Sequence, residues 1–149
     1  MLKIRKADSN DMHPILGLYA QPKMDNGNVI EVEAAQAIFK RMQSYPNYHL
    51  YVAVSNECIV GTFALLIMDN IGHQGSPSGI IEDVVVDASC QGQGIGRQMM
   101  QYAYEECQKA GCYKMMLSSN LKRTDAHAFY ESLGFEKHGF SFRVSSKEK

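Results

Sequence analysis

The chain of 149 residues is 45% hydrophobic and 21% charged, a composition typical of one globular domain and unlike that of a disordered segment. Lys and Arg number 15 and Asp and Glu 16, which gives a formal net charge of -1. This balance argues against a nucleic acid or an anionic membrane as the main partner, because phosphate contacts require surplus cations.

The first half of the chain alternates between strand-like and helix-like hydrophobic patterns. Asp8 stands where a helix N-cap is expected, with Asp11 three residues later, and Pro46 ends the second helical pattern. Residues 55–57 separate two apolar runs, which predicts a β-hairpin. The expected elements are a strand over residues 2–6, helices from about residue 9 and over about residues 31–45, and hairpin strands over residues 50–54 and 58–68.

The second half contains the strongest helical pattern, which Gly111 ends as an expected C-cap residue. The expected elements are strands over about residues 79–86, 112–118 and 135–144, and helices over residues 94–110 and 124–133. The order predicts one α/β domain over residues 1–149, with a mixed, mostly antiparallel sheet of six or seven strands flanked by about four helices.

A glycine-rich loop follows the apolar strand over residues 79–86. Gly92, Gly94 and Gly96 lead into the next helix, whose first turn has unpaired, partly positive N–H groups. Glycine lets such N–H groups turn toward a ligand, so the pattern indicates a diphosphate site, with a merely tight connection as the alternative. The loop lacks the Gly-Lys-Ser/Thr of a P-loop and the GxGxxG spacing of a dinucleotide site.

Two motifs in the expected order resemble those of the GNAT superfamily of acyl-CoA-dependent N-acetyltransferases. Gln91, Gly94 and Gly96 match the family's Gln/Arg-x-x-Gly-x-Gly/Ala signature. Residues 128–135, Ala-Phe-Tyr-Glu-Ser-Leu-Gly-Phe, resemble its "FYxxxGF" region. The resemblance extends along the chain and implies the GNAT fold.

The resemblance implies acetyl-CoA as cosubstrate. The loop amides from Gln91 to Gly96 would hold the pyrophosphate, and the backbone of Val84 to Val86 would pair with the pantetheine arm like an added strand. Asn120 would offer its side-chain amide to the same arm, with a turn-forming role as the alternative. The candidate cofactor-binding residues are Val84, Val85, Val86, Gln91, Gly92, Gln93, Gly94, Ile95, Gly96, Arg97, Asn120 and Phe129.

Glu82 is the candidate catalytic base, because a carboxylate in an apolar strand is costly to bury and attack on a thioester requires a neutral amine. It could instead anchor the amine or simply face solvent, and Asp83 is a second candidate. Tyr130, the tyrosine of the "FY" pair, is the candidate acid that protonates the departing thiolate; a core tyrosine is the alternative. A backbone N–H near Val84 and Val85 would meet the developing oxyanion.

The stretch from Ser118 to His127 looks more like aminoalkylphosphonate acetyltransferases than like the glucosamine-phosphate acetyltransferases, which share the Ile-Glu-Asp segment. Lys122, Arg123, His127 and His138 form either an anion-binding rim or a solvated charge cluster. No Cys or His spacing suggests a metal. The four cysteines are expected to be buried and reduced, and Cys90 has no paired His for covalent catalysis.

The resemblance implies an enzyme that transfers an acetyl group from acetyl-CoA to a primary amine of a small molecule, by direct attack in a ternary complex. A CoA-binding regulatory or sensing module without turnover and a protein-modifying acetyltransferase remain open. We expect the loop over residues 70–78 to help select the acceptor. No membrane span or signal-peptide core is apparent, which predicts a cytoplasmic protein, and a homodimer is left open.

Overall fold

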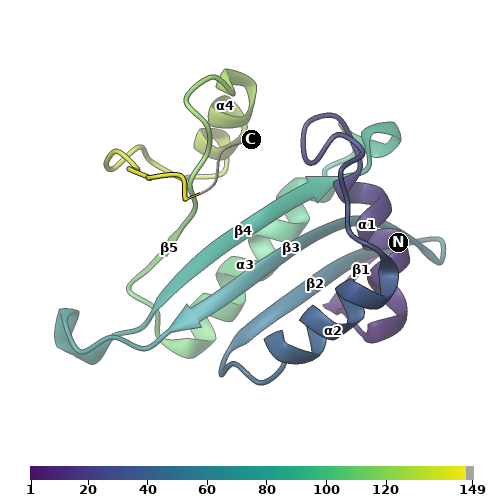
Figure 1. Ribbon diagram of the computed structural model, residues 1–149. Helices are drawn as coiled ribbons and strands as arrows, with labels where there is room; N and C mark the ends of the chain where they lie inside the picture. The colour runs from purple at the N-terminus through teal and green to yellow at the C-terminus, as the bar shows by residue number, and fades with distance from the viewer. Residues whose placement is uncertain (147–149) are drawn as a thin grey trace. The chain divides into compact units, whose positions relative to one another are not determined.

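The computed structural model describes residues 1–146 (Figure 1). The chain divides into two compact units, a large unit of Met1–Leu117 and a small unit of Ser118–Lys149. The large unit contains the sheet and three α-helices, and the small unit contains the fourth α-helix. One domain over the whole chain stays a prediction.

The sheet of the large unit has five strands in the order β1-β2-β3-β4-β5, where six or seven were expected. The first four are antiparallel neighbours, and β5 runs parallel to β4 but pairs only with Ser78–Ile80. Asn56 and Glu57 both have positive φ in the β2–β3 turn, as a tight hairpin requires, so the predicted hairpin is confirmed. The strands are β1 (Leu2–Lys6), β2 (Tyr48–Ser55), β3 (Cys58–Met68), β4 (Ser78–Val86) and β5 (Lys114–Met116).

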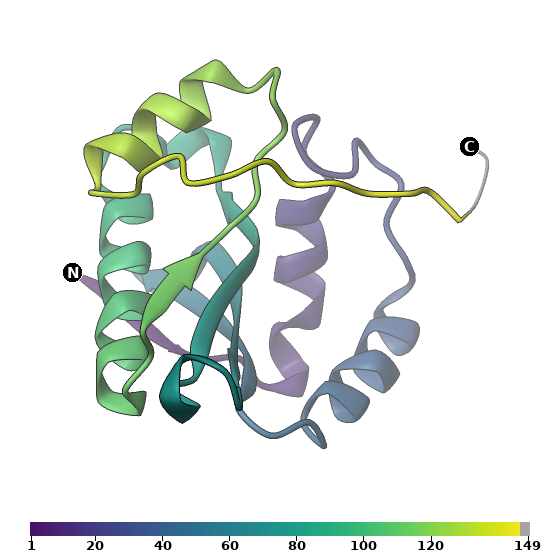
Figure 2. The same cartoon turned by 90° about the vertical axis from the view of Figure 1, so that its left-hand side faces the viewer.

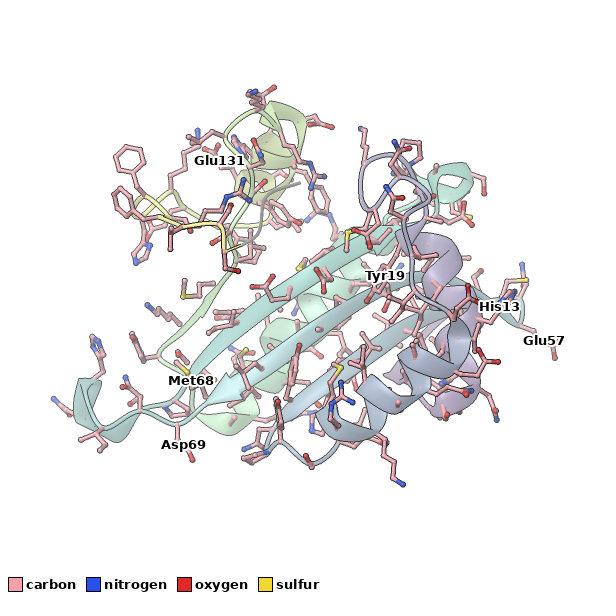
Figure 3. All side chains as sticks on the ribbon, in the orientation of Figure 1. His13, Tyr19, Glu57, Met68, Asp69 and Glu131 are labelled. Carbon is pink, nitrogen blue, oxygen red and sulfur yellow. The ribbon has the colours of Figure 1, made fainter. Side chains whose placement is uncertain are left out.

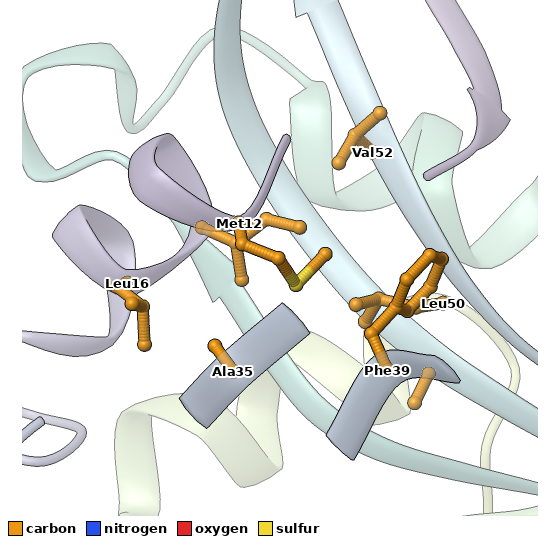
Figure 4. Packing of buried hydrophobic residues seen from close by; sticks show 8 residues of the cluster. Met12, Leu16, Ala35, Phe39, Leu50 and Val52 are labelled. Carbon is orange, nitrogen blue, oxygen red and sulfur yellow. The ribbon is translucent and has the colours of Figure 1, made fainter. Parts of the chain in front are cut away.

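Helices cover both faces of this sheet, with α1 and α2 on one side and α3 on the other (Figure 2). On the first side, Met12 and Leu16 of α1 pack with Phe39 of α2 and with Leu50 and Val52 of β2 (Figure 4). The large unit contains α1 (Met12–Tyr19), α2 (Val32–Met42) and α3 (Ile95–Ala110), with short 3-10 turns at Ser9–Asp11, His73–Gly75 and Ala88–Cys90. All three helices occur where the sequence predicts them.

The start of α1 is fixed by a charged network that the sequence partly predicts. Asp8 caps the turn over Ser9–Asp11, and the Asp11 side chain accepts a hydrogen bond from the Asp8 amide in return. Arg5 of β1 donates two hydrogen bonds to the Asp11 carboxylate, at 2.7 and 3.0 Å. Hydrogen bonding to Arg5 holds the pKa of the buried Asp11 below its usual value, which ties β1 to α1.

Close packing against α3 explains two glycines of the sheet. A Cβ at Gly61 would approach the Met99 sulfur to 2.7 Å, and a Cβ at Gly79 would clash with the Cys107 sulfur. Gly111 ends α3 with φ 78°, as predicted for its C-cap residue.

The small unit contains α4 (Thr124–Ser132), close to the predicted helix. The strand predicted over residues 135–144 is wrong, because none of these residues is in a strand. Phe140, Phe142 and Val144 are 82%, 91% and 94% exposed, so the alternating pattern is present without a partner strand to complete a hydrogen-bonded ladder. The strand predicted over residues 112–118 shrinks to β5 for a related reason, since its pairing with β4 covers three residues.

Candidate active site

A β-bulge near the middle of β4 determines which side chains of this strand reach the site. Ala64 of β3 faces Glu82, but Thr62 faces Val85, so Phe63 lies opposite both Asp83 and Val84. Asp83 has φ 53°, in the left-handed region that few residues other than glycine, Asn and Asp adopt. The bulge therefore takes Asp83 out of the regular alternation of the strand, while Glu82 keeps its regular partner, Ala64.

A pocket of about 370 Å³ lies over this bulge, on the α1 and α2 side of the sheet. Its size is within the range of small-molecule sites. Five of its lining residues are polar: Tyr19, Asp25, Asn28, Tyr48 and Asp83. The other eleven are apolar: Met12, Ile15, Leu16, Val29, Ile30, Ala35, Ile38, Phe39, Met42, Leu50 and Ala64.

The polar end of the pocket is acidic. Asp83 is open to the pocket, yet the surrounding protein removes enough water to raise its pKa, and the nearby Asp25 raises it further. Burial raises the pKa of Tyr19 and Tyr48, and the charge of Asp83 adds to both shifts. Figure 3 shows Tyr19 at the C-terminal end of α1. Asp25, Asp83 and the two phenols interact electrostatically, and the two carboxylates favour a cation in the pocket.

Glu82, the predicted base, lies beside this pocket. Its register partner Ala64 lines the pocket, so Glu82 belongs to the same face of the sheet. The side chain is exposed, and its charge contributes to the raised pKa of Tyr48. Within the described part of the chain, Asp83 rather than Glu82 is the pocket-lining carboxylate of β4. The loop over residues 70–78 precedes β4 and does not line this pocket either.

The predicted diphosphate loop begins where β4 ends. The Asp87 side chain accepts hydrogen bonds from the Ser89 amide at 2.9 Å and hydroxyl at 2.7 Å, which hold the pKa of Asp87 below its usual value. Gly92 and Gly94 both have φ 80°, with open space where a Cβ would stand. Gly94 caps α3, and Gly96 lies in its first turn.

The loop and the neighbouring strand fit a CoA-like ligand. The first amides of α3 have no helical acceptor, and the two left-handed glycines turn the preceding backbone without side chains in the way. Beyond Ile80, the edge of β4 that faces away from β3 has no strand partner among residues 1–146. The backbone of Val84–Val86 is thus available for a strand-like partner, as the resemblance implied.

Gln21 connects the pocket loop to the end of β4, and no sequence motif marked it as a functional residue. Its side-chain amide donates to the Val86 carbonyl at 3.2 Å, and its carbonyl accepts from the Ala88 amide at 2.7 Å. The loop between α1 and α2, which contains Asp25, is thereby bound to the end of β4. Neither Gln21 nor Asp25 lies in a recognisable motif, and each approaches β4 only through the tertiary fold.

The small unit contains the other predicted residues. Tyr130 of α4 is half-buried between the rings of Phe129 and Phe135, with centroid distances of 5.3 and 5.6 Å. Burial raises the pKa of Tyr130, and the charge of Arg123 opposes this shift. The phenol therefore keeps its proton at neutral pH, which a general acid requires.

Asn120 has the turn-forming role that was its alternative. Its side-chain oxygen accepts from the Lys122 amide at 2.9 Å, and its backbone oxygen is 2.8 Å from His127 Nε2. Lys122, Arg123 and His138 are exposed. A cofactor role for Asn120 and an anion-binding role for the cations stay predictions.

Three further expectations from the sequence concern metal ligands, membrane spans and cysteines. Residues 1–146 contain no group of three or more His, Cys, Asp or Glu side chains placed to hold a metal, and no helix long and apolar enough to cross a membrane. All four cysteines are free. The predicted burial is wrong for Cys58, which is exposed in the hairpin, and is only partial for Cys90 and Cys112. Cys107 is buried, and burial raises the pKa of its thiol to about 12.

Comparison with known proteins adds an independent line of evidence. Residues 14–135 match the model of the Acetyltransferase (GNAT) family. The chain is 31% identical over 140 residues to the aminoalkylphosphonate N-acetyltransferase of Salmonella typhimurium, covering 94% of this chain and 88% of that protein. It is 28% identical over 136 residues to the glucosamine 6-phosphate N-acetyltransferase of Arabidopsis thaliana, covering 89% and 88%.

A solved structure described as a transcriptional regulator from Bacillus halodurans C-125 has a similar fold. Its TM-score is 0.89 at 29% sequence identity, over 97% of this chain and 99% of that one.

Proposed function

Because this chain belongs to the acetyltransferase (GNAT) family, we propose that it transfers an acetyl group from acetyl-CoA to the primary amine of a small molecule. One observation carries the proposal: β4 joins an acidic pocket, an unpaired backbone edge and a loop suited to a diphosphate. A single strand thereby connects an acceptor pocket to a donor site.

The donor side is assigned to backbone groups. The amides of Gln91–Gly96 hold the pyrophosphate at the N-terminus of α3, and Val84–Val86 pair with the pantetheine arm. Acetyl-CoA supplies the activated thioester when it is bound. Ile95, Arg97, Asn120 and Phe129 remain secondary candidates for contacts with it.

The acceptor side requires a carboxylate, because an alkyl ammonium must lose a proton before it attacks a thioester. The pocket geometry supports Asp83, with Asp25, as the partner of the incoming ammonium. Glu82, exposed beside the pocket, takes the proton directly or through water. Base and amine anchor, which were alternative roles for Glu82 in the sequence analysis, are thus divided between neighbours in this proposal.

Tyr130 protonates the departing thiolate in this proposal. Tyr130→Phe removes only the phenolic hydroxyl, so we expect acetyl-CoA binding to persist while turnover falls by roughly a hundredfold. The measurement is turnover at saturating substrates together with the thermal shift caused by acetyl-CoA. Unchanged turnover, with the chemical step rate-limiting, would assign the proton to water or to another side chain.

The decisive experiment supplies a panel of primary amines with acetyl-CoA and detects each acetylated amine by mass spectrometry. Direct product detection is preferable to a thiol reagent, because the exposed Cys58 would react with such a reagent. Acetylation of any small amine supports the proposal. A rise in melting temperature with acetyl-CoA but no acetylated amine would instead support a binding module without turnover.

A further inference from the structure

The walls of the acceptor pocket are mostly apolar, unlike its acidic end. Eleven of the sixteen lining residues are apolar, and they come from α1, α2, the loop between them and the sheet. Two of these apolar residues, Ile30 and Ile38, are 47% and 39% exposed at the edge of the pocket. A ligand bound here would contact a largely apolar surface with two carboxylates, Asp25 and Asp83, at one end.

In the described chain, the charged residues that line the pocket are both acidic. Within residues 1–146, none of the residues that line it is Lys, Arg or His. A phosphate or phosphonate in this pocket would lose water without gaining a cationic partner, and Asp25 and Asp83 would repel it. An ammonium group gains from both carboxylates, and an apolar body gains from leaving water.

We propose that this site selects amines with an apolar, uncharged body and disfavours amines that carry a phosphate or phosphonate group. The proposal rests on the proposed function for the identity of the reacting group, and adds the class of acceptor. It separates this chain from its relatives named for aminoalkylphosphonate and glucosamine 6-phosphate.

The test compares two probes that share a two-carbon spacer, 2-phenylethylamine and 2-aminoethylphosphonate, and a second pair, glucosamine and glucosamine 6-phosphate. With the full chain and saturating acetyl-CoA, we expect kcat/KM for 2-phenylethylamine to exceed that for 2-aminoethylphosphonate by roughly tenfold or more. Glucosamine should likewise be preferred over its phosphate. A preference for the phosphonate and the sugar phosphate would overturn the inference and leave the proposed function intact.

Two variants of α2 test whether the pocket itself sets this preference. Ile38→Lys adds a cation at the exposed edge of the pocket, so the ratio of the two kcat/KM values should fall by about tenfold. Ala37→Lys adds the same charge to an exposed, non-lining position one residue away, and the ratio should stay within about twofold. Equal effects of both variants would contradict the assignment of the pocket as the acceptor site.

A binding measurement distinguishes failure of the inference from failure of the proposed function. If no amine is acetylated, the proposed function fails, and calorimetric titration of the same two probes still tests the pocket. Tighter binding of 2-phenylethylamine, weakened by Ile38→Lys and not by Ala37→Lys, would support the inference. Tighter binding of 2-aminoethylphosphonate, or binding of neither probe, would overturn it.

Discussion

Asp83 combines a left-handed backbone with a partly desolvated charge, two unfavourable features at one residue. Such conformations persist where the surrounding structure enforces them, and they are frequent at functional sites. Asp tolerates this region better than most residues because its short side chain can bond locally, and Asn shares this property. Substitution of Asp83 by Asn can therefore remove the charge while keeping the tolerance for a left-handed backbone.

Asp83→Asn should raise the KM for the amine by tenfold or more, because the ammonium loses its charged partner. It should not lower the melting temperature at pH 7. The raised pKa means that the folded state binds this proton more tightly than the unfolded state, so the stability from Asp83 is present at low pH and is lost as the pH rises through its folded pKa. Steady-state kinetics and thermal unfolding from pH 4 to pH 8 measure both effects.

Glu82→Gln is the matched variant on the adjacent residue. If Glu82 is the base, Glu82→Gln should lower kcat by roughly a hundredfold with little change in KM. Higher pH should restore part of the rate, because more amine arrives deprotonated. The same kinetic change in both variants would show that the two carboxylates do not have separate roles. A lower melting temperature of either variant would indicate a structural role for the substituted carboxylate.

Gly94→Asp should abolish the thermal stabilisation by acetyl-CoA, because it brings a side chain and a negative charge to the proposed pyrophosphate site. Gly111→Asp is its control at the other end of α3. Both glycines have left-handed φ, near 80° and 78°, and open space at the Cβ position, so both variants impose comparable backbone strain. If Gly111→Asp reduces the acetyl-CoA shift equally, the effect reflects helix strain rather than the ligand site.

At the scale of the elements, the loop between α1 and α2 is the least regular part of the pocket, and consecutive turns hydrogen-bond it to itself and to α1. Its turns return to the end of α1, where the Asp25 amide donates to the Tyr19 carbonyl at 2.8 Å. Gln21 makes the connection to β4 on both sides of Asp87. One side chain thus links the acceptor loop to the beginning of the cofactor loop.

Gln21→Ala should lower the free energy of unfolding by about 1–2 kcal/mol, since it removes two side-chain hydrogen bonds. It should also weaken binding of both substrates, because Asp25 and Ala88 lose their common support. Gln36→Ala removes one hydrogen bond, to the Ser9 carbonyl, and serves as the control that leaves both affinities unchanged. Calorimetric unfolding and substrate titration of the two variants provide the comparison.

Elements whose signals are local could be predicted from the sequence. The Asp8 cap, the β2–β3 turn and the Gly111 stop each depend on residues within a few positions of one another. The strand over residues 135–144 fails for the opposite reason. Its alternating pattern is genuine, but a strand also requires a partner, which a local pattern does not specify.

At the scale of the whole molecule, one part of the site depends on local signals and the other on the tertiary fold. The diphosphate loop is contiguous, and its glycines adopt the conformation that their residue type predicts. The pocket draws Tyr19, Asp25, Tyr48 and Asp83 from four separate segments. The sequence ranked Glu82 above Asp83, yet Asp83 lines the pocket, because a one-residue bulge that no local pattern specifies decides which side chain does so.

The short β4–β5 pairing has a consequence for hydrogen–deuterium exchange. Amides of Ile81–Val86 that point away from β3 lack a strand acceptor in the described chain, so without ligand they should exchange quickly although they belong to the central sheet. Acetyl-CoA should slow them by an order of magnitude or more if its pantetheine arm completes the ladder. Amides of Tyr51–Ser55 in β2, paired with strands on both sides, should be unaffected. Equal protection throughout the sheet would instead indicate global stabilisation, without a bound arm along this edge.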